Sequence, residues 1–134
     1  MENKVSAQPI IAPFPPLGGQ GAVFSKSECL SHYTWGDDCH GWIFIDTGAL
    51  SVKQELMPPD TAEKLHYHEN AMQLFFILKG RAVLTVDGAE TVLREQQGIQ
   101  VNPGEKHFIA NKHHTDLEFI LYSYPSTKND RIEL

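Results

Sequence analysis

The sequence has little of what marks a secreted, membrane-bound or disulfide-stapled protein. Its two cysteines, Cys29 and Cys39, do not form a pair spaced for metal or redox chemistry. We expect two reduced thiols, and a disulfide stays open as the alternative. The longest apolar run, Leu74 to Leu78, is too short to cross a bilayer, and no secretory signal precedes it. The sequence therefore predicts a cytoplasmic protein without a membrane partner.

Clusters of positive charge are also missing. The chain carries 11 Lys and Arg against 17 Asp and Glu, a net charge of -6, and its basic residues are scattered. This pattern argues against nucleic acid as a partner. No nucleophilic triad or phosphate-binding loop can be recognised from motif spacing. With 134 residues and an apolar share of 41%, the chain can form one domain with one core.

Proline and glycine divide the chain into three parts. Residues 1–40 form a predicted N-terminal extended arm, because prolines and glycines near its start oppose helices and central strands. Apolar residues interrupt these prolines, so we expect the arm to lie against a surface. Residues 41–126 form a predicted barrel, and residues 127–134 a C-terminal tail.

Beyond Gly41 the sequence predicts an all-β domain. Short β-prone segments alternate with turn signals about every ten residues, a pattern typical of sandwiches and barrels. Asp87-Gly88 is the strongest hairpin signal. The predicted strands are Trp42 to Asp46, Leu50 to Met57, Gln73 to Leu78, Arg81 to Val86, Glu90 to Arg94, Ile99 to Val101, His107 to Asn111, and Leu117 to Tyr124.

The strand that begins at Gln73 is apolar on both faces. If Gln73 points inward, Phe75 and Ile77 share its face, while the alternate residues form an equally apolar outer face. A strand of this kind is normally covered on both sides. The outer cover can come from the N-terminal arm, another sheet or a partner subunit, and we predict a homodimer.

Three histidines and a glutamine predict a metal site. His66 and His68 are two residues apart, so an extended backbone directs both imidazoles to one side. Gln73 and His107 can close the site from neighbouring strands. If Gln73 only packs against the ligands, the three histidines form the site alone. Glu69 follows His68 directly, but strand alternation points it away.

These residues resemble the two motifs of the cupins, and the chain is similar to a small single-domain cupin of the cupin 2 conserved-barrel type. His66, His68 and Gly80 match the first motif, in which Asp60 replaces the opening glycine and Gln73 replaces the glutamate. Gly104, His107 and Asn111 match the second, in which Gln96 replaces the opening glycine. The resemblance implies a double-stranded β-helix (jelly-roll) barrel.

In the family, the two motif histidines, the glutamate and the later histidine bind a divalent metal. The resemblance therefore implies one divalent transition metal ion, Fe, Mn, Ni or Zn, at His66, His68, Gln73 and His107. A neutral amide in place of a carboxylate leaves more positive charge on the ion. We expect weaker binding of the metal and stronger binding of an anionic ligand.

Two functions are consistent with these residues. In the first, a metal-dependent, dioxygenase-like enzyme acts on a small anionic metabolite, and the catalytic residues beyond the ligands are unknown. In the second, the pocket binds a metal or a metabolite without turnover. We predict that the pocket wall consists of Phe75, Ile77, Ile109 and Asn111.

Overall fold

The computed structural model describes residues 21–134 as two antiparallel β-sheets with one short 3-10 helix. The first half of the predicted arm, residues 1–20, lies outside the described residues. The elements are η1 (Lys26–Glu28), β1 (Ser31–Trp35), β2 (Cys39–Asp46), β3 (Ser51–Met57), β4 (Thr61–Ala62), β5 (His66–Tyr67), β6 (Met72–Lys79), β7 (Ala82–Val86), β8 (Ala89–Leu93), β9 (Gly98–Val101), β10 (His107–Asn111), β11 (Leu117–Tyr124) and β12 (Ile132–Glu133).

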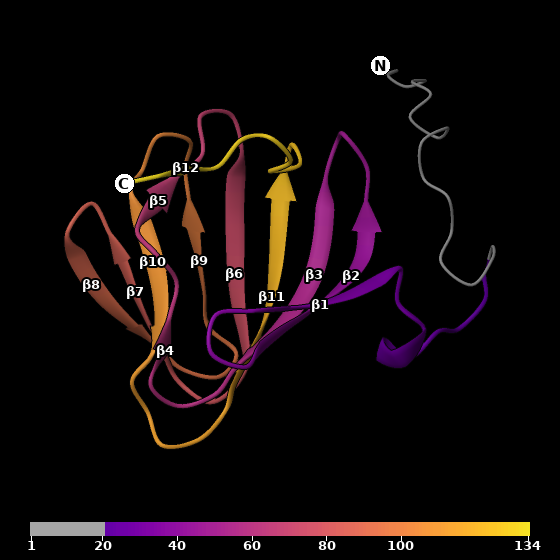
Figure 1. Cartoon of the computed structure of the whole chain (residues 1–134), viewed down its shortest axis with the longest axis horizontal. Coiled ribbons are helices and arrows are strands. Elements are labelled where there is room, and N and C mark those ends of the chain that lie inside the picture. Colours follow the sequence, from indigo (N-terminus) through magenta and orange to yellow (C-terminus); the bar gives the residue numbers. More distant parts are fainter. Residues whose placement is uncertain (1–20) are drawn as a thin grey trace, which may run out of the picture.

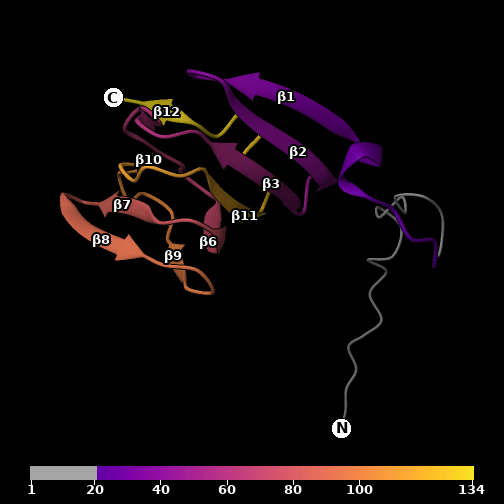
Figure 2. The same cartoon turned by 90° about the horizontal axis from the view of Figure 1, so that it is seen from below.

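The strand order is that of an antiparallel jelly-roll. One sheet has the order β1-β2-β3-β11-β6-β9, and the other has the order β12-β5-β10-β7-β8, with β4 paired to β10. The β7–β8 hairpin lies on the opposite side of the molecule from β2 (Figures 1 and 2). The predicted all-β, double-stranded β-helix fold is confirmed. No helix among the described residues is long and apolar enough to cross a membrane.

All eight predicted strands are present, with ends that differ by at most a few residues. The structure adds β1, which pairs with β2 and lies within the segment 1–40 that the sequence assigned to the arm. It also adds three two-residue strands, β4, β5 and β12. In Figure 1 the last of these lies beside β5, because the predicted tail returns to the barrel.

Backbone geometry explains how the chain departs from the cupin motifs without losing their turns. Asp60 and Gln96, which stand where the motifs have glycine, have φ of 64° and 67°. Both therefore occupy the left-handed region that glycine adopts most easily. Gly80 has φ of 88°, and a Cβ atom there would collide with the backbone oxygen of Asp116. The turn at Gly80 therefore requires glycine.

The core lies between the sheets, and the alternation of β6 follows the prediction. Gln73, Phe75 and Ile77 are at most 4% exposed, whereas Leu74 and Leu78 are 38% and 37% exposed. The inner residues of β6 pack against buried residues of β7, β10 and β11. The outer face of β6 is thus apolar and partly open to solvent.

Candidate metal centre

The three histidines of the two motifs meet inside the barrel. His66 lies on β5, His68 follows it, and His107 opens β10 directly opposite His66. The exposed fractions of the three residues are 1%, 4% and 0%. One ring nitrogen from each lies within 4.8 Å of the others, an arrangement that could hold a metal ion.

Backbone carbonyl groups fix the orientation of all three rings. The Nδ1 atoms of His66, His68 and His107 lie 2.7, 2.6 and 2.8 Å from the carbonyl oxygens of Lys64, Asp130 and Glu105. Because a carbonyl oxygen only accepts, each Nδ1 must carry the proton and donate. Each Nε2 then presents a lone pair, the form in which a neutral imidazole binds metal.

The lone pair of His68 has no partner. Its Nε2 atom is buried and makes no hydrogen bond with any residue from 21 to 134. Buried polar atoms without a partner are rare, because they lose their contacts with water without replacement. Such an atom, aimed at two further imidazoles, fits a bound cation.

Burial also keeps the three rings neutral. It lowers the pKa of His66 to about 3, against the opposing effect of the hydrogen bond to Lys64. Burial lowers the pKa of His68 and of His107 in the same way. The positive charge of Arg131 acts on all three rings in that direction. The cluster therefore retains its lone pairs at neutral pH.

Gln73 lies beside this cluster, and a hydrogen bond to Ser123 fixes the orientation of its amide. The side chain is buried, and its Nε2 donates to the Ser123 hydroxyl at 3.0 Å. Its Oε1 lies 3.1 Å from Nε2 of His107, whose proton is on the other ring nitrogen. Two acceptors at this distance do not bond to each other, and a cation shared between them would satisfy both.

The predicted wall residues belong mainly to the core. Phe75, Ile77 and Ile109 are at most 1% exposed, and the ring of Phe75 lies 6.1 Å from that of His107. Asn111 donates to the carbonyl oxygens of Met57 and Thr115, so its amide links two segments of backbone. The role of these four residues as a pocket wall stays a prediction.

Asp130 is a site residue that the sequence did not indicate. Its carboxylate accepts hydrogen bonds from the backbone N–H groups of Glu69, Asn70 and Ala71, at 2.8 to 3.1 Å. Its own carbonyl oxygen anchors His68. The predicted tail therefore holds the loop between β5 and β6, and Glu69 takes part through its backbone while its side chain is exposed. No local pattern signals a contact across about sixty residues.

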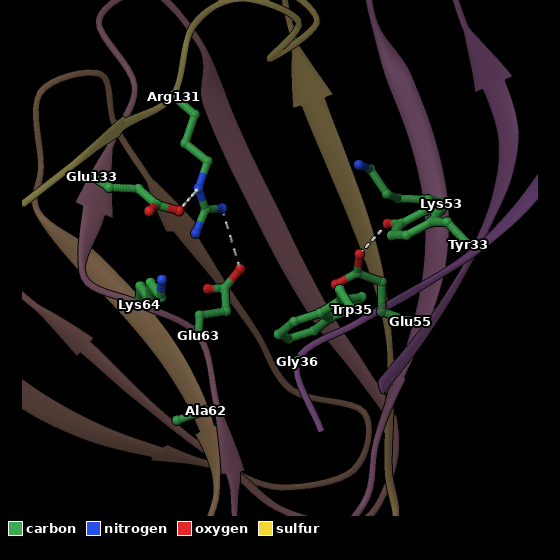
Figure 3. Close-up of a pocket in the computed structure, with 10 residues that line it drawn as sticks. All are labelled: Tyr33, Trp35, Gly36, Lys53, Glu55, Ala62, Glu63, Lys64, Arg131 and Glu133. Atoms are coloured by element: carbon green, nitrogen blue, oxygen red, sulfur yellow. Dashed lines mark hydrogen bonds and ion pairs between the residues drawn. The ribbon is translucent and has the colours of Figure 1, made fainter. Parts of the chain in front are cut away.

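A cavity of about 430 Å³ opens next to this region (Figure 3). It lies between β1, β3, the segment that joins β4 to β5, and the segment that includes β12. Two carboxyl groups, those of Glu55 and Glu63, face it from opposite sides, and Arg131 reaches into it from the C-terminal segment (Figure 3). None of the four predicted wall residues lines this cavity.

Comparisons with known proteins agree with the fold and the sequence motifs described above. The sequence model of the Cupin domain matches residues 53–123. An oxalate-binding protein of Thermotoga maritima is 33% identical over 64 residues, a match that spans 48% of this chain and about half (53%) of that protein. An uncharacterised protein of Methanocaldococcus jannaschii is 25% identical over 84 residues, which span 63% of this chain and 67% of that protein.

Solved structures show the same fold. A predicted oxalate decarboxylase from Thermotoga maritima has a TM-score of 0.70 and 23% identity, and the match covers 78% of this chain and 100% of the other. An RmlC-like cupin from Shewanella frigidimarina has a TM-score of 0.70 and 19% identity, with 82% and 96% covered. With the family match over more than half of its length and three motif histidines gathered in the barrel, this chain belongs to the cupins.

Proposed function

We propose that the chain binds one divalent transition metal ion through His66, His68, His107 and Gln73, and that the ion holds a small anionic molecule. The observation that carries this proposal is the convergence of three Nε2 lone pairs, fixed from behind by carbonyl oxygens. Three imidazoles and an amide oxygen suit Fe, Mn, Ni or Zn. The unpartnered Nε2 of His68 supports an ion at the same point.

Gln73 sets the charge of this site. An amide contributes a dipole where a carboxylate would contribute a negative charge, so the ion retains more of its own charge. An anion that chelates the ion then gains more than it would beside a glutamate. A relative bears the name oxalate-binding protein, which supports a small carboxylate as the ligand class.

The Gln73→Glu variant tests the proposal. We expect it to bind Mn²⁺ or Zn²⁺ about tenfold more tightly and oxalate correspondingly more weakly. The added negative charge attracts the metal ion and repels the anion. Both affinities can be measured by calorimetric titration of metal-free and metal-loaded protein. Gln100→Glu makes the same chemical change at an exposed position of β9 and is the matched control.

If both affinities stay unchanged in Gln73→Glu, the amide is not a ligand and the three histidines form the site alone. Absence of any bound ion in elemental analysis of protein from metal-supplemented cells contradicts the proposal as a whole.

The residues of this chain would position the ligand indirectly, because they bind the ion that the ligand coordinates. A bound divalent ion polarises a coordinated oxygen and lowers the pKa of bound water. The carbonyl anchors keep the three rings from turning away, and burial limits the access of water. Binding of this kind needs no further titratable group, and it is the function that the geometry supports best.

Oxygen-dependent turnover stays a prediction. Oxygen uptake by iron-loaded protein, measured against a panel of keto acids, diketones, thiols and catechols, tests it. Uptake that is lost in His107→Ala supports an enzyme, whereas tight binding without uptake supports a binding module.

The homodimer remains part of the proposal, and the outer face of β6 supports it. Leu74 and Leu78 are more than a third exposed, and Phe76 between them is half-buried. Apolar patches on a sheet face are typical of contacts between proteins. Light scattering in solution should give twice the monomer mass, and a monomer mass contradicts this expectation. A cytoplasmic location likewise stays a prediction.

A further inference from the structure

The 430 Å³ cavity is lined by none of the three clustered histidines. Its volume is within the range of about 300 to 1,000 Å³ that is usual for small-molecule sites. Tyr33 and Trp35 of β1 provide an aromatic wall. The indole N–H of Trp35 is buried and has no hydrogen-bond partner in the described part of the chain. We call this space the Glu55–Glu63 cavity.

The two carboxyl groups in the cavity lie deep. Glu55 is 5% exposed, and the side chain of Glu63 is 10% exposed. Glu55 accepts a hydrogen bond from the Tyr33 hydroxyl, and Glu63 accepts one from the backbone N–H of Ile109 at 3.2 Å. A buried carboxylate normally needs a close cation as well as hydrogen bonds, because burial removes it from water.

Three basic side chains, Lys53, Lys64 and Arg131, also line the cavity, but within the described residues only Arg131 forms an ion pair with either carboxylate. No Lys or Arg nitrogen within residues 21–134 comes within 4.0 Å of the Glu55 carboxylate. Arg131 approaches Glu63 at 3.8 Å, but its closer partner is Glu133 at 3.1 Å (Figure 3). Lys53 turns to the ring of Tyr33, with its Nζ atom 5.5 Å from the ring centre. Among residues 21–134, Glu55 therefore has no basic side chain within 4.0 Å, and Lys53 and Arg131 act on it only from farther away.

Burial opposes the ionisation of both carboxyl groups. Burial and the nearby charge of Glu55 raise the pKa of Glu63 to about 8. Burial likewise raises the pKa of Glu55, against the opposing effect of the Tyr33 hydrogen bond. Two carboxyl groups that share a buried site resist ionisation together, and a further cation placed between them would favour the charged form of both.

We infer that the Glu55–Glu63 cavity binds a small molecule with a primary ammonium group, which sits between the two carboxylates. An ammonium group donates three hydrogen bonds, enough to reach both carboxylates at once. Tyr33 and Trp35 favour it further, because aromatic faces attract cations. The residues that line this site include none of the proposed metal ligands.

Butan-1-amine and butanoate are a matched pair of probes, since they have similar size and opposite charge. We expect butan-1-amine to bind the whole chain in ligand-observed NMR or calorimetric titration near pH 7.5, and butanoate to bind at least about tenfold more weakly. Treatment with a metal chelator should not weaken the binding of the amine, because no histidine takes part.

Glu55→Gln and Glu63→Gln should each weaken the amine by about tenfold or more, because each removes one charged acceptor while keeping its size. Glu90→Gln is the matched control, since it removes a carboxylate that lies exposed on β8 in an ion pair with Lys112. Melting curves confirm that the variants are folded.

Three outcomes overturn the inference. The first is no binding of butan-1-amine up to about 10 mM. The second is a butanoate affinity equal to that of the amine. The third is a loss in Glu90→Gln as large as that in the cavity variants, which would mean that general surface charge attracts the amine.

Discussion

The histidine cluster and the Glu55–Glu63 cavity are both built from buried titratable side chains, and they solve the burial of polar groups in different ways. In the cluster, each ring has its outer nitrogen satisfied by a backbone carbonyl oxygen, and burial favours the neutral form. In the cavity, burial opposes the charged form, and the charges of Lys53 and Arg131 offset this effect only in part. The first region is organised for an electron-pair acceptor, and the second for a positive charge that donates hydrogen bonds.

The largest expected effect is on metal affinity, and it follows from the removal of one histidine of the cluster. His107→Ala should lower the affinity for Zn²⁺ or Mn²⁺ by more than about 100-fold, beyond what loss of an indirect partner costs. Calorimetric titration of metal-free protein measures this change. His113→Ala is the control, because His113 lies outside the cluster. An equal loss in both variants would show that the ion binds elsewhere.

The next effect tests whether the histidine cluster depends on the C-terminal segment. Asp130→Ala removes the acceptor of three backbone N–H groups, and we expect a loss of about 3 kcal/mol in the free energy of unfolding. The metal affinity should fall by about 10-fold to 100-fold, because the loop that carries His68 loosens.

Hydrogen exchange checks this second prediction directly. The amides of Glu69, Asn70 and Ala71 should lose protection in Asp130→Ala and keep it in Asp116→Ala, which removes an exposed carboxylate. Unchanged protection in both variants would mean that the loop is held without Asp130.

The smallest effect concerns the cavity and its dependence on pH. The pKa of Glu63 is about 8 in the folded chain, above its ordinary value of 4.5. The unfolded chain therefore releases the Glu63 proton first, and the free energy of unfolding falls as pH rises from about 4.5 to about 8.

In Glu63→Gln this slope should flatten, so that the variant gains about 2 kcal/mol relative to the parent between pH 5 and pH 8. Denaturant unfolding at a series of pH values measures the difference. A parallel pair of curves would show that Glu63 ionises as freely in the folded chain as in the unfolded one.

The strands could be predicted wherever the chain itself carries a signal. Alternation of apolar residues placed Gln73, Phe75 and Ile77 on one face, and the Asp87-Gly88 turn fixed the β7–β8 hairpin, in which Val86 pairs with Ala89. The two-residue strands β4, β5 and β12 are too short to show alternation, and they are strands only because partners lie beside them. The β1 strand was missed because it precedes the regular pattern.

The same distinction explains the site. His66 and His68 share a strand segment, so their spacing alone indicated a common direction, and the structure gathers them with His107. Asp130 reaches the loop only through the return of the C-terminal segment, which no local pattern encodes. Glu55 looks like any polar residue of a strand until β1 and the C-terminal segment enclose it.

Because His66 and His107 are anchored by the carbonyl oxygens of Lys64 and Glu105, this support places no demand on the side chains at those two positions. The two side chains make other contacts. Lys64 lines the Glu55–Glu63 cavity, and Glu105 accepts a hydrogen bond from the backbone N–H of Asn102. A substitution at either position can thus change the contacts of its own side chain, while the backbone carbonyl group still orients the imidazole. A lineage of such barrels could exchange its small-molecule preference without first rebuilding its metal ligands.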